Sequence, residues 1–201
     1  MSTISKYKYR GKNAEHESQM SLMDGYVQQL ANAESLDEVM GLEGISAKSY
    51  WSCFRLMLNK PVFTRREYRP SPDYVNALLN LGYAFLAKEV TTSLIAKQFD
   101  LEIGFLHSIH HGRNSLKIDI MEEFRSPFID AWLLVLLNRN QIKAEHFHFV
   151  DGDWRLNSVG FEKFAGLYHE RVPFWIDKIR EQANRFKTTL LENSIYEPYR
   201  E

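Results

Sequence analysis

The 201-residue sequence predicts an all-α protein, a bundle-like helical domain with one short β-hairpin near 147–156. Three observations support this fold class. Apolar residues recur at three- and four-residue spacing over most of the chain, as on the buried face of a helix. Helix-start signals precede several of these segments, including the capping box Ser35–Glu38 and the run Ser71-Pro72-Asp73. Alternation of polar and apolar residues, which is typical of a strand, is confined to the hairpin region, where Asp151-Gly152 is a turn sequence.

The elements follow in a clear order along the chain. A basic arm (1–12) precedes a helical domain (13–192), which contains the candidate catalytic residues named below, and a flexible tail (193–201) without strong pattern. Within the domain we expect helices at 15–32, 36–58, 71–99, 115–124, 128–137, 157–168 and 173–191. The apolar run Phe128 to Leu137 should be the most buried of them.

Glycine and proline predict where these helices are disturbed. Gly41 and Gly44 flank Glu43 and interrupt the second helix, which indicates either a bend or close approach of a backbone or a ligand. Ser126-Pro127 predicts a kink or restart, and Pro173 is expected to open the last helix. Gly82, between large apolar residues, predicts tight helix packing.

Charge and composition limit the classes of function. The 25 basic and 26 acidic residues give a net charge of −1, so any nucleic-acid surface must be local. Charge is segregated, with a basic arm from Lys6 to Lys12, seven acids and no Lys or Arg in 14–43, and basic residues again from Arg55 to Arg69. Cys53 is alone, which excludes a disulfide framework and indicates a buried thiol. Without a signal region or a long apolar run, we expect a cytoplasmic protein and no membrane partner.

The candidate metal-ligating residues lie mostly between Gly104 and Arg125. A loop carries His107, His110 and His111. The helix predicted to start at the N-cap Ser115 then places Asp119 on one face with Glu122 and Glu123. Two carboxylates and one imidazole suit Mn²⁺ or Mg²⁺. A solvated acidic helix face gives the same spacing. A zinc site built from the three histidines is disfavoured because their spacing matches no zinc signature.

Four motifs together carry a resemblance to a known family. They are SLDEVMGLEGISAKSYW at 35–51, RREYRPSPDYVNALLNLGYAFL at 65–86, GFLH followed by SLKIDIMEEFRSPFIDAWLL at 104–134, and DGDWRLNSVGFEKF at 151–164. In order and spacing the chain resembles the helical domain of the CRISPR-associated integrase of spacer acquisition, the Cas protein numbered one.

The resemblance implies a site and an activity. Its metal ligands correspond to Glu43, His107 and Glu122, with Asp119 as a neighbouring acid that either supports a ligand from behind or is an additional ligand. The implied enzyme is a Mn²⁺- or Mg²⁺-dependent DNA integrase and endonuclease, in which a 3′-hydroxyl attacks a phosphodiester to insert a spacer into a repeat array. The implied partners are branched or duplex DNA and the small CRISPR adaptation partner protein, with homo-oligomers in full-length members. DNA-contact candidates in the basic clusters and beside the site are Arg65, Arg66, Arg69, Arg113 and Arg125.

The sequence also departs from the family. We expect the chain to lack the usual N-terminal β-rich domain, and hence to be a monomer or a weak dimer by itself. Two other functions therefore stay open. One is a non-catalytic or truncated DNA-binding structural subunit of the adaptation complex. The other is an unrelated metal-dependent hydrolase, which the four-motif match disfavours.

Overall fold

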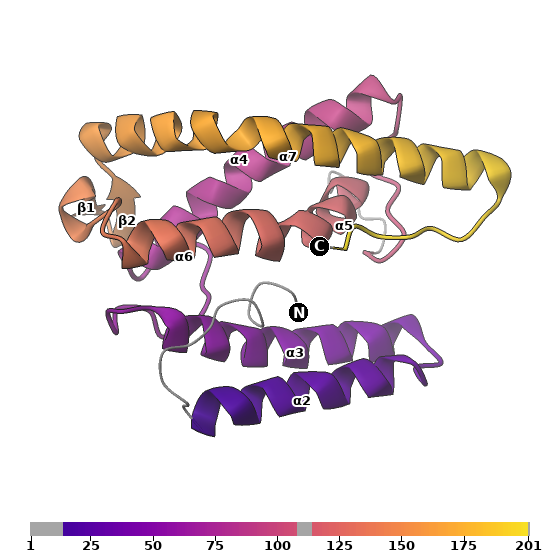
Figure 1. The fold of residues 1–201 in the computed structure, drawn as a ribbon, viewed down its shortest axis with the longest axis horizontal. Helices are drawn as coiled ribbons and strands as arrows, with labels where there is room; N and C mark the ends of the chain where they lie inside the picture. Colours follow the sequence, from indigo (N-terminus) through magenta and orange to yellow (C-terminus); the bar gives the residue numbers. More distant parts are fainter. Residues whose placement is uncertain (1–13, 108–113, 201) are drawn as a thin grey trace.

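The fold is helical, as predicted, in a computed structural model that describes residues 14–107 and 114–200. The predicted basic arm therefore lies outside the described residues, as do His110, His111 and Arg113. In order, the elements are α2 (Ala14–Leu30), α3 (Leu36–Met57), α4 (Tyr74–Ala96), α5 (Ser115–Phe124), the π-helical turn η1 (Arg125–Asp130), α6 (Ala131–Asn138), the 3₁₀ turn η2 (Ala144–His146), β1 (Phe147–Val150), β2 (Asp153–Leu156) and α7 (Ser158–Glu192) (Figure 1).

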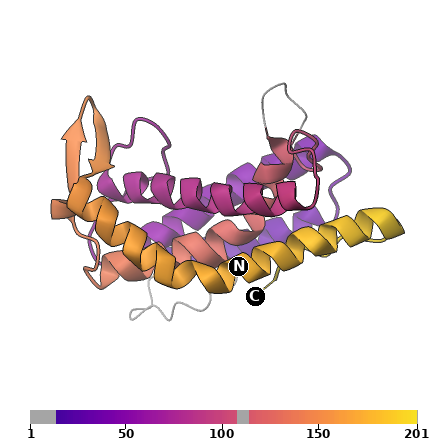
Figure 2. The ribbon, with the colours of Figure 1, turned by 90° about the horizontal axis from the view of Figure 1, so that it is seen from above.

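The helices form two layers. The antiparallel pair α2 and α3 lies against a second layer built from α4, α5, α6 and α7, in which α4 crosses behind α7 (Figure 1). Figure 2 shows the β1–β2 hairpin at the end of the molecule where α7 begins. The centre of the second layer is aromatic, with the Phe128 and Trp175 rings stacked at 4.9 Å. A Cβ at Gly82 would lie 2.7 Å from Ile129 Cγ2, so α4 and η1 pack closely there, as predicted.

Two predicted interruptions are wrong. Helix α3 runs unbroken through Gly41 and Gly44, and a Cβ at either position would meet no atom within 4 Å. Neither glycine is therefore required for close packing among the described residues. Helix α7 continues through Pro173 as a single helix of 35 residues. Val172, Trp175 and Ile179 stay buried on both sides of the proline, and this packing outweighs a cost of about 3 kcal/mol for an interior proline.

The segment after α7, for which the sequence predicted a flexible tail, makes specific contacts with α5. Asn193 ends α7 with a left-handed backbone conformation, and the chain then returns along α5 (Figure 1). The Tyr196 hydroxyl donates to Glu123 Oε1 at 2.6 Å, and the Tyr199 backbone N–H donates to Glu123 Oε2 at 2.7 Å. The Tyr199 ring stacks on Phe124. These contacts tie the C-terminal segment to the helix that also carries Asp119 and Glu122.

The β-hairpin has the predicted position and turn. Phe147 pairs with Leu156 and Val150 with Asp153, and Asp151 and Gly152 both have positive φ, as a tight hairpin turn requires. His146, the residue just before Phe147, is not part of strand β1. It lies buried in η2, where its Nδ1 accepts the Lys143 backbone N–H. Among the described helices, none combines the length and the apolar sequence that a membrane span needs.

Candidate active site

The most tightly built contact of the site joins His107 to Asp119 on α5. Asp119 is 3% exposed, and its Oδ1 lies 2.5 Å from His107 Nδ1. The same carboxylate accepts the backbone N–H groups of Phe105 at 2.6 Å, Leu106 at 3.0 Å and His107 at 3.1 Å. A carboxylate beside Nδ1 holds the proton there, so Nε2 keeps its lone pair. The imidazole is thus oriented and kept in the tautomer that can ligate a metal ion.

Gly104 lets the loop approach this carboxylate. A Cβ at residue 104 would lie 2.6 Å from Asp119 Oδ2 and 2.8 Å from Ser115 Cβ. Any side chain there would push the loop from α5 and lengthen the hydrogen bonds from residues 105–107. The glycine of the GFLH run therefore has a steric cause. Ser115 itself is buried as the first residue of α5, whereas the N-cap is Asn114, so the predicted capping role of Ser115 is wrong.

Glu43 and Glu122 face a common cavity of about 510 Å³ between the two layers. Helices α2 and α3 contribute an apolar side that includes Met20, Met23, Val27 and Leu42, and the other layer contributes polar side chains that include Tyr83, Arg125, Ser126 and Asp130. We call this cavity the central cleft. It places Glu43, which is 79 residues earlier in the chain, in the same space as Glu122.

The pKa of the Glu122 carboxyl depends on the charged groups around it. Burial raises the pKa of Glu122, and the negative charges of Glu43 and Asp119 raise it further. Arg125 and His107 oppose these effects by favouring the ionised form. Glu43 on α3 and His107 in the loop before α5 therefore both lie close enough to Glu122 on α5 to influence its charge.

In this structure the predicted ligands are not arranged as a metal-binding group. Glu122 Oε1 lies 2.5 Å from Arg125 Nη1, so the carboxylate is engaged by a cation of the protein. Over residues 14–107 and 114–200, no three His, Cys, Asp or Glu side chains are arranged to hold a metal ion. The chemistry of the donors nevertheless fits Mn²⁺ or Mg²⁺. Two carboxylates and the free Nε2 of His107 provide hard oxygen ligands and one imidazole. Asp119 already accepts four hydrogen bonds, one of them from the His107 ring, so its role is to orient that imidazole.

One of the acids that line the central cleft, Asp130, is buried. Asp130 is 2% exposed and accepts the hydroxyls of Tyr83 at 2.5 Å and Tyr50 at 2.6 Å. Burial raises its pKa to about 6, while these two hydrogen bonds oppose the rise. The sequence analysis missed this cluster. The signal was available, since Asp130 is the only charged residue within the apolar run from Pro127 to Leu137.

The predicted DNA-contact arginines occupy different environments. The Arg66 guanidinium donates to Asn80 Oδ1 at 2.5 Å and to Asn76 Oδ1 at 3.0 Å, and it lies over the rings of Tyr68 and Tyr83. It is therefore a structural link rather than a free surface cation. Arg65 is exposed and pairs with Glu67. Arg125 pairs with Glu122 and also lies over Tyr83, at 5.3 Å from the ring centroid.

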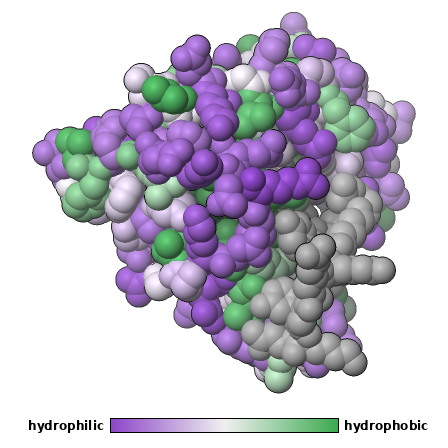
Figure 3. Space-filling model, turned by 60° about the vertical axis from the view of Figure 1, so that its left-hand side comes forward, coloured by the Kyte–Doolittle hydropathy of each residue, from purple (hydrophilic) through white to green (hydrophobic). Residues whose placement is uncertain are grey.

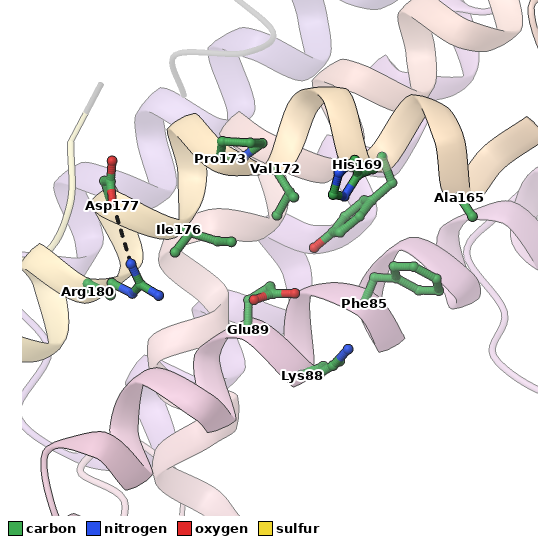
Figure 4. Close-up of a pocket in the computed structure, with 11 residues that line it drawn as sticks. Phe85, Lys88, Glu89, Ala165, His169, Val172, Pro173, Ile176, Asp177 and Arg180 are labelled. Atoms are coloured by element: carbon green, nitrogen blue, oxygen red, sulfur yellow. Dashed lines mark ion pairs between the residues drawn. The ribbon is translucent and has the colours of Figure 1, made fainter.

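A second cavity, between α4 and α7, is separate from these residues. It has a volume of about 490 Å³ and an apolar floor that includes Val172 and Ile176 (Figure 4). Its charged side chains are of both signs, and one pair, Arg180 and Asp177, is separated by 3.8 Å. None of the predicted ligands lines it, so the central cleft is the candidate active site.

Comparison with known proteins agrees with the resemblance seen in the sequence. Residues 1–170 match the family model described as CRISPR associated protein Cas1. The chain belongs to the Cas1 family. A relative from Thermus thermophilus, named CRISPR-associated endonuclease Cas1 3, is 36% identical over 141 residues, which is 70% of this chain and 42% of the relative. The CRISPR-associated endonuclease Cas1 of Leptospira interrogans is 36% identical over 179 residues, 85% of this chain and 70% of the relative.

Solved structures confirm the helical architecture. A Cas1 protein from Thermotoga maritima superposes with a TM-score of 0.84 at 25% identity, covering 98% of this chain and 62% of that one. A Cas6-RT-Cas1–Cas2 complex matches all of this chain with a TM-score of 0.87 at 24% identity and shares the fold. The chain spans 42%, 60% and 40% of three curated Cas1 relatives, so it corresponds to part of their length.

Proposed function

We propose that this chain is the catalytic helical part of a divalent-metal-dependent Cas1 DNA integrase and endonuclease of CRISPR adaptation. The reaction is phosphodiester transfer, in which a 3′-hydroxyl of a short DNA attacks the repeat and inserts a spacer. The partners are branched or duplex DNA and the small adaptation protein, Cas2, which appears in the name of the structurally similar complex. One observation carries the proposal. Glu43 and His107 both influence the charge of Glu122, and the buried carboxylate of Asp119 bonds Nδ1 of His107, which leaves Nε2 for a metal ion.

The protein groups divide the work. Glu43, His107 Nε2 and Glu122 would hold a Mn²⁺ or Mg²⁺ ion, which would polarise the scissile phosphate and stabilise charge on the leaving oxygen. Asp119 keeps His107 in place and in the ligating tautomer. Arg125, which pairs with Glu122 in this structure, would be available for a phosphate oxygen if Glu122 held the ion.

The test is strand transfer and disintegration of a branched DNA in Mn²⁺ and then Mg²⁺, with and without Cas2. We expect Glu43→Ala, His107→Ala and Glu122→Ala each to abolish both reactions. The losses should not add in double variants, because removal of one ligand already empties the site. Binding of DNA without metal should persist in all three.

Matched controls come from exposed positions of the same residue types. His148→Ala on β1 and Glu162→Ala on α7 remove an exposed imidazole and an exposed carboxylate that do not line the cleft, and both should retain activity. Full activity of any of the three ligand variants would contradict the proposed set. Zinc-dependent activity that disappears with His110→Ala or His111→Ala would instead favour an unrelated hydrolase.

A non-catalytic DNA-binding subunit is the second candidate. The Glu122–Arg125 ion pair favours it, because Arg125 takes the position that a metal ion would need. Inactivity of the wild-type protein with every metal and with Cas2, together with retained DNA binding, would select this function.

A further inference from the structure

The cavity of about 490 Å³ between α4 and α7 has no part in the candidate active site. We call it the α4–α7 cavity. Helix α4 contributes Phe85, Lys88 and Glu89, and α7 contributes the other lining residues, which include Tyr168 and Ile176. Among the described residues, none lines both this cavity and the central cleft. The volume lies in the range of about 300–1,000 Å³ that is typical of small-molecule sites.

The lining includes a buried hydroxyl without a hydrogen-bond partner. Tyr168 is 4% exposed, and within residues 14–107 and 114–200 its Oη makes no hydrogen bond. Its ring is held by aromatic neighbours, because Phe85 packs edge-on against it at 4.8 Å and Phe128 stacks on it at 5.8 Å. A buried hydroxyl that lacks a partner costs free energy, since water solvates it in the unfolded chain. A bound group that reached Oη would remove this cost.

The carboxylate of Glu89 is a second unsatisfied group in the α4–α7 cavity. Figure 4 shows Glu89 extending from α4 toward α7. Burial raises the pKa of Tyr168, and the negative charge of Glu89 raises it further, so the two groups lie close to each other. In the part of the chain that the structure describes, Glu89 forms no hydrogen bond and no ion pair. One bound group can therefore contact both side chains.

The basic residues of the cavity do not neutralise Glu89. Lys88 is its neighbour on α4, and the side chains of consecutive residues do not face each other on a helix. Arg180 lies 3.8 Å from Asp177, so these two charges are matched within α7. His169 is exposed and makes no ion pair with any residue that the structure describes. The unmatched charge beside the Tyr168 hydroxyl is therefore negative.

Pro173 adds a third oxygen to this lining. A proline has no backbone N–H, so the carbonyl of His169, four residues earlier, lacks the donor that it would have in a regular helix. Both residues line the cavity. A carboxylate, a hydroxyl and a backbone carbonyl without their usual partners together suit a ligand group that donates several hydrogen bonds.

Apolar side chains adjoin these oxygens. Val172 is buried and Ile176 is partly buried, so a hydrocarbon chain bound against them would leave water. The ring of Phe85 also lines the cavity, and an aromatic face attracts a cation. The described residues on the face that brings the β1–β2 end forward are mostly hydrophilic, with small and separate hydrophobic areas (Figure 3). Since a protein partner would need a broader apolar surface, these features favour a small molecule.

We propose that the α4–α7 cavity binds a small organic cation, a primary ammonium on an aliphatic or aromatic chain. The ammonium donates to the Glu89 carboxylate and to the Tyr168 hydroxyl oxygen, and the chain packs along Val172 and Ile176. An ammonium carries three N–H donors and no acceptor, which matches the oxygens of the lining. Because the ligand contacts both helices, it stabilises the packing of α4 on α7.

The test uses n-hexylammonium as the probe and measures its affinity for the whole chain by NMR titration. The largest shifts should fall on the α4 and α7 residues around the cavity. Hexanol and hexanoate have the same chain with a neutral and an acidic head group, and each should bind at least about tenfold more weakly, because neither supplies a charged donor. Glu89→Gln should weaken hexylammonium binding by about tenfold or more and leave hexanol binding unchanged.

Tyr168→Phe tests the hydroxyl separately. It should weaken hexylammonium binding by about two- to fivefold, the effect of one lost hydrogen bond. The melting temperature of the free protein should stay unchanged or rise, because the hydroxyl has no protein partner to lose. A lower melting temperature together with no binding of hexylammonium would show that the hydroxyl bonds to solvent alone, and it would overturn the proposal.

The matched control is Glu170→Gln, which removes an exposed carboxylate of α7 that does not line the cavity. It should leave the affinity for hexylammonium unchanged. Equal affinity of wild type and Glu89→Gln, or tighter binding of hexanoate than of hexylammonium, would contradict the assignment of a cation site. The measurement requires no DNA, no metal ion and no catalysis, so its outcome is independent of the proposed integrase function.

Discussion

The carboxylate of Asp119 and the ring of His107 form a hydrogen bond of 2.5 Å, with Asp119 completely enclosed. His107 lies at the end of a loop, whereas Asp119 belongs to α5. The bond therefore transfers the rigidity of a packed helix to a loop residue, and the three backbone N–H groups on the same carboxylate extend this effect to Phe105 and Leu106. A site whose imidazole is fixed in advance loses less conformational entropy when a metal ion binds.

The first prediction follows for Asp119→Asn. The amide keeps the shape of the carboxylate, but its NH₂ group faces donors and favours a proton on Nε2 of His107 rather than Nδ1. We expect Mn²⁺ affinity to fall by about 10- to 100-fold, measured by calorimetry, with strand transfer lost in proportion. The ¹⁵N shifts of the imidazole should report the changed tautomer. Asp177→Asn, on an exposed part of α7, is the matched control. Unchanged affinity and tautomer would contradict the holding role.

The second prediction concerns Arg125→Gln. Because Arg125 is bonded to Glu122, a metal ion must displace it before the carboxylate can ligate. Removal of the guanidinium should increase Mn²⁺ affinity in the absence of DNA by up to about fivefold, the range of a partly exposed ion pair. The same change should weaken DNA binding and slow strand transfer. If Mn²⁺ affinity fell instead, Arg125 would support the metal site rather than compete for it.

The third prediction concerns Asp130 and pH. The fold raises the pKa of this acid from 3.8 to about 6, so ionisation is less favourable in the folded protein than in the unfolded chain. Its contribution to stability is therefore complete below about pH 4 and is lost as pH rises to about 6. Asp130→Asn removes this titration. The free energy of unfolding of the variant relative to wild type should rise by up to about 3 kcal/mol between pH 4 and pH 7.

Urea unfolding at several pH values measures that difference. The loss of ideal hydrogen bonds to Tyr50 and Tyr83 adds a constant offset, so the slope with pH is the diagnostic quantity. Parallel stability curves for variant and wild type would show that Asp130 does not titrate in this range.

The fourth prediction concerns the C-terminal segment. Tyr196→Phe removes the hydroxyl that donates to Glu123 and accepts from Gln182. Burial already raises the pKa of Glu123, and loss of a donor leaves its carboxylate less satisfied. We expect a loss of about 1–3 kcal/mol in the free energy of unfolding. Tyr26→Phe on α2, where no partner of the hydroxyl is described, serves as the control. Equal stability of Tyr196→Phe and wild type would mean that the segment rests on α5 without stabilising it.

The sequence predicted the helices and the hairpin because both follow from local patterns. The predictions were wrong where contacts between residues distant in sequence determine whether a helix continues. Gly41 and Gly44 did not break α3, since they lie toward open space, and Pro173 did not end α7, since the buried residues around it continue in helical period. The tail lacked a pattern because its order depends on Glu123, more than 70 residues earlier.

The site residues also fall into those that the sequence identified and those whose contacts only the structure shows. Glu43, His107 and Glu122 were identified through the family resemblance, and their shared neighbourhood supports that assignment without testing ligation. Spacing placed Asp119 beside Glu122 on the helix, but only the approach of the Gly104 loop shows that Asp119 faces His107. The interaction of Arg66 with Asn80 was likewise beyond sequence reasoning, because a basic loop residue has no local signal that distinguishes a surface cation from a buried link.

The π-helical turn η1 joins α5 to α6 and carries one more residue per turn than an α-helix. Deletion of a single residue from it, such as Ser126, would allow an α-helical turn and rotate one flanking helix against the other by about 100°. Both helices would survive, but Glu122 and Asp130 could no longer face the cleft and its two tyrosines together. A one-residue deletion here is thus expected to erase function while preserving helix content, and insertions or deletions in homologous chains should avoid these six positions.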